Sequence, residues 1–262
     1  MIGPAELANL AAQRRQVLKE EPGTTVLLLG SGAGAVVQKT YRVRGLRQVQ
    51  SWWRRSRAQR EHDSLAAIAA AGVPCLQPLG WSAVPAFFGF RESTLVTRFL
   101  VDSTPLKQVL RALPRSSPLR ARLATAMGEL VGALHRHGFL WCTPMPRNVL
   151  VVGDPAGAAL AVCDTPACVL FPRSLHGTRR ARIDLFLGAF SPSRRTDWSA
   201  AERLRWLRGY CGGDRTAARN LWRPMQRRST LQNELERALA MAAFTYILAR
   251  FRPTRQRPDP TR

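Results

Sequence analysis

The sequence predicts an α+β fold, with a small antiparallel sheet in the first hundred residues and a mainly helical part after it. Two observations predict this division. Short apolar runs separated by glycine and proline turns fill the first part, which is typical of antiparallel strands. After residue 105, apolar residues recur every three or four positions, which is typical of helices. The 262 residues are enough for one large lobe or two small ones, each with its own core.

The chain opens with a helix and two strands. Apolar residues at helical spacing predict a short helix within residues 5–16. Apolar runs at 16–19 and 24–29 predict two strands. The Glu-Glu-Pro-Gly segment at 20–23 predicts the turn between them, because proline and glycine favour turn conformations.

Three glycines close together precede the next strand. Gly30, Gly32 and Gly34 could belong to a loop that binds phosphate, but the last of them lies only five residues before Lys39. Two strands do not fit into that interval, so a plain hairpin turn is the better interpretation. A third strand then covers residues 35–41 and carries Lys39.

A single helix is predicted in the first part, over the segment SRAQREHDSLAAIAAAG at residues 56–72. Glu61, Leu65 and Ile68 share one face of it, since residues three and four apart are neighbours on a helix. Glu61 would therefore point inward, toward Lys39. The alternative, a surface carboxylate among arginines, stays open. Further strands are predicted at 76–81, 87–90 and 93–99.

In the helical part, a buried helix leads to a loop and a hairpin. Apolar periodicity predicts a helix over residues 120–137, which Gly138 ends. Two apolar runs follow the loop at 143–148, and they place Asn148 before and Asp164 after the hairpin. An amide oxygen and a carboxylate brought together in this way suit Mg²⁺, whose remaining ligands can be phosphate oxygens.

The segment HGFLWCTPMPRNVLV, residues 137–151, resembles the HGF-x-H-G-D-L-H-P-x-N motif of the lipopolysaccharide (Kdo/heptose) kinase family, within the protein-kinase-like superfamily. In kinases a catalytic Asp precedes a metal-binding Asn by five residues, and a second metal-binding Asp follows. Those positions hold Thr143, Asn148 and Asp164, and Trp-Cys-Thr at 141–143 replaces His-Gly-Asp. The resemblance implies that the metal ligands are kept and that the catalytic base is lost.

The resemblance runs from about residue 17 to about residue 210 and implies a bilobal protein-kinase-like fold. A first lobe, residues 1–100, would hold a five-stranded antiparallel sheet with one helix. A second lobe, residues 101–251, would be mainly helical, with the cofactors ATP and Mg²⁺ bound between the two. The tail at 252–262, rich in Pro and Arg, is predicted to be disordered.

The resemblance also implies nucleotide-binding roles in the first lobe. Lys39 would hold the α- and β-phosphates, and Glu61 would pair with it. Thr24, in the turn between the first two strands, would offer its hydroxyl to a phosphate. The backbone at Thr97 and Phe99 would form a hinge that meets the adenine edge.

One further acid, Asp184, has an implied structural role. The segment at 182–188 resembles the Asp-bearing helix that braces the catalytic loop in kinases, where the carboxylate accepts backbone N–H groups. A buried carboxylate requires such partners. After Asp164 the family's Phe-Gly or Phe-Asp is replaced by Thr-Pro-Ala at 165–167, so the following segment is short and carries no sign of a phosphorylation switch.

The composition indicates an anionic partner. Lys and Arg number 40 against 17 Asp and Glu, a net charge of +23. Nucleic acid, a phosphorylated glycan and an acidic membrane face are the candidates; a genome composition that favours arginine is the alternative explanation. Seven arginines lie between Tyr41 and Glu61, with Trp52 and Trp53 among them. Similar segments in lipopolysaccharide kinases favour the membrane and glycolipid interpretation over a solvated face.

The cysteines and the lengths of the apolar runs indicate the cellular compartment of the protein. The five cysteines are scattered, without the spacing of a zinc site or a disulfide framework, which fits a reducing cytosol. No apolar run reaches the roughly 18–20 residues that span a bilayer. We therefore expect a cytoplasmic protein that meets a membrane, if at all, at the surface of its inner face.

Three functions from different classes follow. The first is a sugar kinase that phosphorylates an anionic glycolipid or sugar acceptor from ATP, favoured by Lys39, Glu61, Asn148 and Asp164. The second is a pseudokinase that binds nucleotide or acts as a scaffold, favoured by Thr143. The third is a basic nucleic-acid-binding protein, which only the charge and the Trp/Arg segment support. No feature predicts the oligomeric state.

Overall fold

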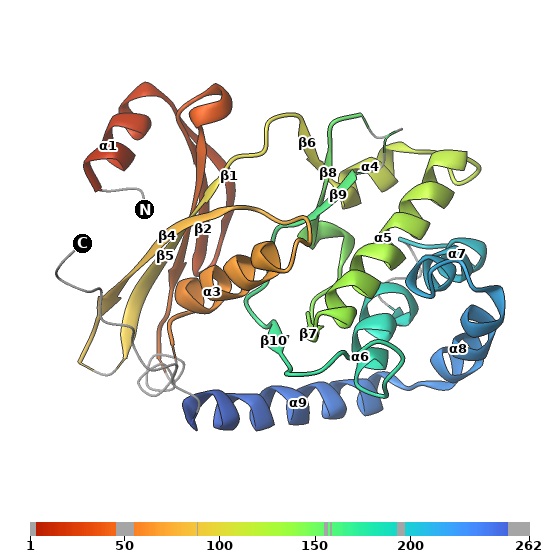
Figure 1. The fold of residues 1–262 in the computed structure, drawn as a ribbon. Coiled ribbons are helices and arrows are strands. Elements are labelled where there is room, and N and C mark those ends of the chain that lie inside the picture. The colour runs from red at the N-terminus through yellow and green to blue at the C-terminus, as the bar shows by residue number, and fades with distance from the viewer. Residues whose placement is uncertain are drawn as a thin grey trace, which may run out of the picture.

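A computed structural model of the chain describes residues 4–45, 55–87, 89–154, 157, 159–192 and 197–250, with side chains as far as residue 240. The chain forms two lobes, one built around a sheet and the other around helices (Figure 1). This is the two-lobed α+β architecture that the sequence predicts. The lobe bounds at residues 100 and 251 stay predictions. Trp52, Trp53 and the tail lie outside the described residues.

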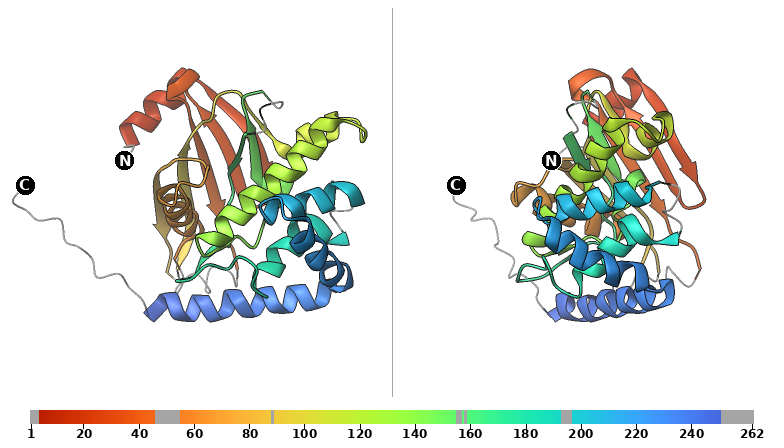
Figure 2. Two further views of the ribbon diagram at one scale, coloured as in Figure 1. Left: turned by 45° about the vertical axis from the view of Figure 1, so that its right-hand side comes forward. Right: turned by 90° about the vertical axis from the view of Figure 1, so that its right-hand side faces the viewer.

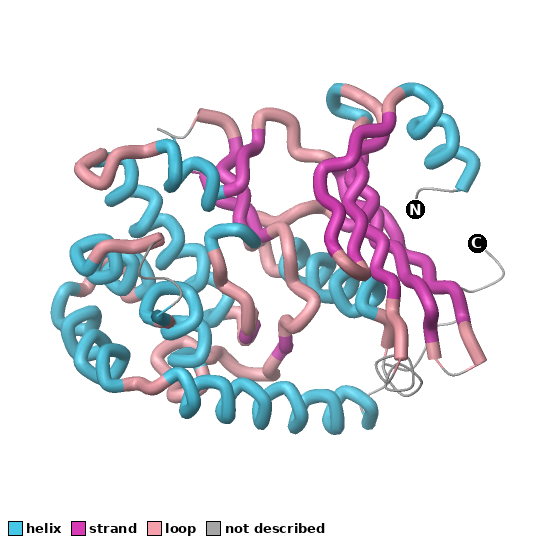
Figure 3. Tube along the Cα trace, turned by 180° about the vertical axis from the view of Figure 1, so that it is seen from behind, coloured by secondary structure: helices cyan, strands magenta, loops and turns pink. Residues whose placement is uncertain are grey.

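The sheet lobe contains five antiparallel strands in the order β1-β2-β3-β5-β4. The strands are β1 Arg15–Glu21, β2 Thr24–Leu29, β3 Val36–Arg42, β4 Pro78–Pro85 and β5 Phe90–Arg98. Two helices accompany them, α1 Pro4–Gln13 and α3 Arg57–Ala70. Seen from behind, the sheet forms one side of the molecule and helices fill most of the other (Figure 3).

Alternation of side chains along the strands explains how both faces of the sheet are covered. Tyr41 and Leu95 point to the inner face and pack against Leu65 of α3. Apolar residues on the outer face pack against α1, and they are Leu27, Leu29, Val36 and Val96. Each buried leucine or valine contributes about 1.5–3 kcal/mol relative to an exposed one. Lys39 lies two residues before Tyr41 and therefore on the inner face.

The end of the sheet differs in one respect from the sequence-based expectation. A separate strand predicted at 87–90 is absent from the described residues there. Instead the N–H of Ala86 donates to the carbonyl of Gly89 at 2.9 Å, and β5 begins at Phe90. A positive φ of 72° at Gly89 allows this tight turn, so one long hairpin, β4 to β5, replaces three short strands.

The helical lobe surrounds one central helix, α5. Its helices are α4 Leu106–Ala112, α5 Pro118–Arg136, α6 Ala181–Leu185, α7 Ala200–Tyr210, α8 Arg215–Arg227 and α9 Thr230–Arg250. Two small sheets complete it, one of β6 Ser103–Pro105, β8 Val149–Val152 and β9 Ala159–Val162, the other of β7 Phe139–Leu140 and β10 Val169–Leu170. Leu123, Met127 and Val131 of α5 are fully buried, so this helix forms the centre of the lobe's core.

Helices α5 and α7 cross with their backbones in contact. A Cβ atom at Gly128 of α5 would lie 1.9 Å from the carbonyl oxygen of Trp206, and one at Gly209 of α7 would lie 2.1 Å from that of Thr125. Neither distance is tolerable for a side chain. Only glycine at both positions permits this close packing.

Helix α8 occupies an arginine-rich stretch for which no element is predicted from the sequence. Asp214 caps it, since its Oδ1 accepts from the backbone N–H groups of Thr216 and Ala217 at 2.8 and 3.0 Å. Pro224 lies inside the helix. Within the described part of the chain, no helix combines the length and the apolar composition that crossing a membrane requires.

Candidate functional site

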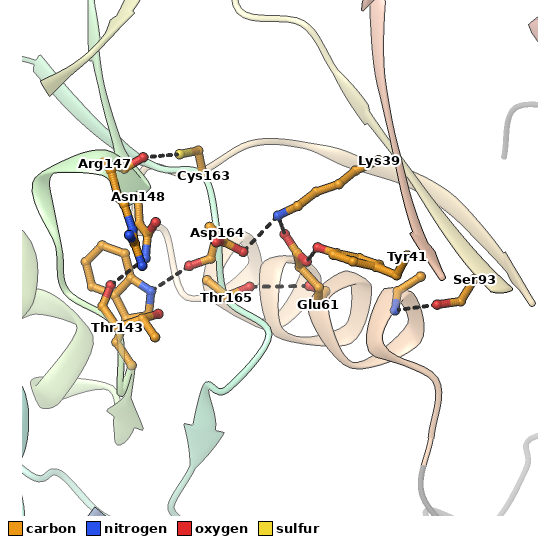
Figure 4. Close-up of polar contacts among 12 residues, drawn as sticks. Lys39, Tyr41, Glu61, Ser93, Thr143, Arg147, Asn148, Cys163, Asp164 and Thr165 are labelled. Atoms are coloured by element: carbon orange, nitrogen blue, oxygen red, sulfur yellow. Dashed lines mark hydrogen bonds and ion pairs between the residues drawn. The ribbon is translucent and has the colours of Figure 1, made fainter. Parts of the chain in front are cut away.

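Three charged side chains from different parts of the chain meet between the lobes. Lys39 Nζ lies 3.1 Å from Oε1 of Glu61 on α3 and 2.9 Å from Oδ1 of Asp164, which follows β9 (Figure 4). The side chain of Glu61 is 1% exposed, whereas that of Asp164 is 25% exposed. One lysine thus joins a buried carboxylate of the sheet lobe to a partly open carboxylate of the helical lobe.

Tyr41 fixes the buried carboxylate from a second side. It follows Lys39 by two residues on β3, so both side chains lie on the inner face, and its hydroxyl donates a short hydrogen bond to Oε2 of Glu61. The guanidinium group of Arg57, at the start of α3, lies 4.3 Å from the centre of the Tyr41 ring. Glu61 is therefore oriented by two donors before any ligand is considered.

Burial and neighbouring charges govern the ionisation of the pair. Burial raises the pKa of Glu61 above its usual 4.5; the charge of Lys39 opposes this rise and that of Asp164 adds to it. Burial alone would lower the pKa of Lys39, but the charges of Glu61 and Asp164 outweigh that and raise the pKa above 10.5. Lys39 consequently stays a cation across the physiological pH range.

The hairpin β8–β9 brings Asn148 close to Asp164. The register pairs Val149 with Val162, and the N–H of Cys163 donates to the carbonyl of Asn148 at 3.0 Å. Asn148 Nδ2 donates to the carbonyl of Thr143 at 2.9 Å, which leaves its Oδ1 for another partner. The chain segments that the sequence expects to converge do so here.

The side-chain oxygens of Asn148 and Asp164 can be compared with the ligands that Mg²⁺ requires. Among the described residues, no cluster of three or more His, Cys, Asp or Glu side chains is placed to hold a metal ion. A site here would rest on the Asn148 amide oxygen, the Asp164 carboxylate, and oxygens of a ligand or water. An all-oxygen set with few protein ligands suits Mg²⁺, which usually keeps phosphate and water in its shell. The residues fit that ion.

The loop at 141–143 differs from the rest of the site. Thr143 Oγ1 is buried and has no hydrogen-bond partner among the described residues. Cys142 has a φ of 63°, in the left-handed region where glycine is favoured, and it stands where the resemblance places a glycine. Trp141 donates its indole N–H to the backbone carbonyl of Asp164 at 2.8 Å, so it ties the loop to the backbone at Asp164.

Asp184 of α6 supports this loop from beneath. Its two carboxylate oxygens accept the backbone N–H groups of Trp141 and Cys142, each at 2.7 Å. His135 Nε2 lies 3.1 Å from the same carboxylate, and His135 Nδ1 lies 3.0 Å from the hydroxyl of Tyr210 on α7. Asp184 and His135 are completely buried, so a continuous polar chain links α7 to the loop.

The remaining predicted residues lie on β2 and at the end of β5. Thr24 begins β2 and pairs with Tyr41, so it lies on the same inner face. Thr97 is buried near the end of β5. The N–H of Phe99 donates to the carbonyl of Ala35 at 3.0 Å, because the chain leaving β5 pairs with the residue before β3. This bond engages the amide that was expected to face an adenine edge.

Sequence reasoning missed three members of the site. Tyr41 could have been found from its spacing of two from Lys39 on a strand. His135 falls near the end of the helix predicted at 120–137, and its position four residues after Val131, on the buried face, was the available signal. The indole bond of Trp141 carried no sequence signal, because it depends on where the hairpin ends.

A lobe built on a five-stranded antiparallel sheet, followed by a mainly helical lobe, is a bilobal protein-kinase-like fold. A solved structure described as WaaP in complex with acyl carrier protein has this fold: it aligns with a TM-score of 0.57 and 17% identity, over 93% of this chain and 91% of that one. No protein-family model and no curated protein matches the sequence. The bilobal α+β fold predicted from the sequence is thereby confirmed.

Proposed function

We propose that this chain binds ATP with Mg²⁺ between its lobes and transfers the γ-phosphoryl group to a hydroxyl of an anionic sugar or glycolipid. The observation that supports it most is Lys39 bridging Glu61 and Asp164, since a lysine held by a carboxylate is the group that kinases place on the nucleotide phosphates. Maintaining a buried carboxylate is energetically costly unless it is paired. The pairing with Lys39 offsets the cost of burying Glu61, and it holds the lysine in place for a phosphate.

The proposed roles follow from these contacts. Lys39 would bind the α- and β-phosphates, Thr24 would approach them from the turn above, and Asn148 and Asp164 would hold the metal. Mg²⁺, when bound, neutralises phosphate charge. Asp184 would position the loop without touching the substrate.

The missing base affects the rate more than the binding. General-base assistance contributes on the order of 10²–10⁴ in rate, whereas positioning and charge neutralisation carry most of phosphoryl transfer. Thr143 cannot accept a proton at neutral pH. We therefore propose a slow transferase that depends on orientation of the acceptor hydroxyl.

An arginine-lined cavity supports an anionic acceptor. A cavity of about 920 Å³ lies between the β1–β2 turn and the start of α3, and Tyr41 lines it, so it adjoins the Lys39–Glu61 pair. Five arginines line it: Arg42, Arg44, Arg55, Arg57 and Arg60. Arg42 and Arg55 are paired with Glu92 and Asp63 at 3.2 and 2.8 Å. Glu20 and Glu21 also line the cavity, so its charge is mixed but predominantly positive.

A pseudokinase is the second candidate function, and Thr143 favours it. Its hydroxyl is buried, and no Asp, Glu or His lies between residues 140 and 149. Such a module would bind nucleotide, or only hold a partner, without transfer. Nucleic-acid binding is a third proposal with less support, because part of its Trp/Arg segment lies outside the described residues. We further propose a cytoplasmic location at the inner membrane face, which the supply of ATP in the cytosol supports.

The test measures thermal stability with ATP alone and with ATP plus Mg²⁺, on the wild type and on Asp164→Ala. Ligand at a hundredfold above its Kd stabilises a fold by about 2.7 kcal/mol, which raises the melting temperature measurably. We expect a Mg²⁺-dependent shift that Asp164→Ala abolishes. An unchanged melting temperature under every condition would contradict the proposal that the chain binds nucleotide.

Transfer is then assayed with radiolabelled ATP and phosphorylated glycolipid acceptors, on the wild type and on Thr143→Asp. A gain of about 10²-fold or more in Thr143→Asp, with a low but measurable wild-type rate, supports the slow kinase. Binding without transfer in either protein supports the pseudokinase. Because the WaaP structure contains acyl carrier protein, that protein is included as a candidate partner in the binding assays.

A further inference from the structure

Helix α9 carries an exposed row of leucines. Leu231, Leu235 and Leu239 are 80%, 60% and 61% exposed, and their spacing of four places them along one side of the helix. We call these three residues the leucine stripe. The other large apolar residues that are exposed in the described part of the chain are spread over several elements, and only Val17 and Leu18 among them are adjacent in sequence.

Contacts on the opposite side of α9 fix the direction of the leucine stripe. Asn233 is fully buried and its Oδ1 accepts from Arg228 Nε at 2.7 Å. Glu236 lies 3.2 Å from Arg179 Nη2 and is also paired with Arg228. Ala240 packs against the core cluster formed by Leu140 and its neighbours. Rotating the helix to hide the leucines would break all of these contacts.

The helix occupies an outer edge of the molecule. In each view it runs along the base, beyond the helices of its own lobe (Figures 1 and 2). In Figure 1 it extends from α8 past α6 toward the sheet lobe. No described element covers the side on which the stripe lies. The stripe is therefore a convex ridge rather than the lining of a groove.

The surroundings of the stripe are positively charged. The two acids of α9, Glu234 and Glu236, are both paired with arginines. Residues 172–182 and 215–229, which lie before or beside α9, contain no acid, and Asp184 of α6, a helix that also contacts α9, is fully buried. Their exposed arginines include Arg173, Arg179, Arg180, Arg223 and Arg227. Directly after α9 the sequence at 251–262 adds four arginines and one aspartate.

We propose that α9 docks the chain on an acidic lipid bilayer, with the leucine stripe entering the interface and the flanking arginines meeting anionic headgroups. An apolar ridge flanked by arginines is the pattern of helices that lie in the plane of a membrane surface. Headgroups of negative charge complement the basic surroundings. A second copy of the chain would bring another +23 charge to the contact, which disfavours self-association there.

The test is co-sedimentation of the full chain, without nucleotide, with vesicles of phosphatidylcholine alone or mixed with phosphatidylglycerol. We expect binding to the acidic vesicles only, and weaker binding when salt rises from about 0.1 M to about 0.5 M. Because nucleotide is absent, the outcome is independent of the proposed kinase function.

The decisive variant is Leu231→Gln, Leu235→Gln, Leu239→Gln. Its matched control changes three scattered exposed leucines in the same way: Leu18→Gln, Leu170→Gln, Leu204→Gln, whose native side chains are 46%, 46% and 39% exposed. We expect the stripe variant to lose about tenfold or more in vesicle affinity and the control about twofold or less. Melting curves establish that both variants are folded.

Three results would overturn the docking proposal. The wild type could fail to bind acidic vesicles. The stripe variant could bind as well as the control, which would assign membrane binding to the basic tail alone. Finally, sedimentation velocity could show a wild-type dimer that the stripe variant dissociates, which would make the leucine stripe an interface between copies of the chain.

Discussion

The sheet lobe and the helical lobe contribute different things to the site. On the sheet side, Lys39, Glu61 and Tyr41 keep a complete set of charges and hydrogen bonds around one buried carboxylate. On the helical side, the loop at 141–143 keeps its backbone anchored on Asp184 but carries no acid of its own. Conformation and reactivity are therefore specified by different residues. Asp184 binds backbone N–H groups, so it holds the loop whatever side chains the loop carries.

The largest effect is expected on the helical side, from Asp184→Ala. The change leaves two buried N–H groups and the buried His135 without their acceptor, and each unmet buried donor costs about 1–3 kcal/mol. Chemical denaturation should show a loss of about 3–5 kcal/mol. A loss below about 1 kcal/mol would mean that the loop does not depend on Asp184, and the contrast between the two sides would disappear.

A smaller effect, on ligand binding, is expected from Lys39→Met on the sheet side. If Lys39 binds phosphate, ATP affinity measured by calorimetry should fall about 10- to 100-fold, because a hydrogen bond to a charged group contributes about 1.5–3 kcal/mol. Lys19→Met is the matched control, since Lys19 is exposed on β1. Equal ATP affinities of Lys39→Met and Lys19→Met would show that Lys39 does not bind phosphate.

The pH dependence of stability sharpens the comparison further. Because burial raises the pKa of Glu61 in the folded chain, the folded state binds the proton more tightly than the unfolded state does. The wild type should therefore lose stability as the pH rises from 4.5 through the folded pKa, relative to Glu61→Gln, which has no such proton. Denaturation of both proteins at pH 4.5, 6 and 7.5 measures the difference. A wild type that instead gains stability relative to Glu61→Gln as the pH rises would contradict the assignment.

The smallest effect concerns the backbone of the loop. Glycine is normally less stable than alanine by about 0.5–1 kcal/mol, but at Cys142 the positive φ penalises any side chain by about 1–2 kcal/mol. Cys142→Gly should consequently be more stable than Cys142→Ala by about 0.5–1 kcal/mol in thermal denaturation. The usual order, with alanine the more stable, would show that the loop relaxes away from this conformation.

Much of the fold follows from sequence because its signals are local. The hairpin that presents Asn148 and Asp164, the helix that presents Glu61 and the strand that presents Lys39 each have a clear period and a turn at each end. Their meeting point required the resemblance to kinases, since spacing alone does not bring β3 to β9. Helix α8 was missed for a local reason: Pro224 and seven charged or polar residues obscure its apolar stripe, although Asp214 is a good N-cap.

The parts that sequence could not provide depend on contacts distant along the chain. The bond from Trp141 to the carbonyl of Asp164 spans 23 residues, and the bond from His135 to Tyr210 spans 75. Neither has a motif. The engaged N–H of Phe99 is similar, because the residue that accepts it, Ala35, comes from the turn before β3. The local sequence pattern determines which helices and strands form. Contacts between distant parts of the chain determine which polar groups remain free to bind a ligand.

The contact of α5 with α7 has a consequence for how this chain can vary. Because Gly128 and Gly209 let the two backbones touch, they set the separation of His135 from Tyr210, and His135 in turn touches Asp184. A methyl group on either glycine would force the two helices apart. His135 and Asp184 would then shift, and the loop at 141–143 would shift with them. Two glycines that lie outside the site thus determine the position of the loop at 141–143.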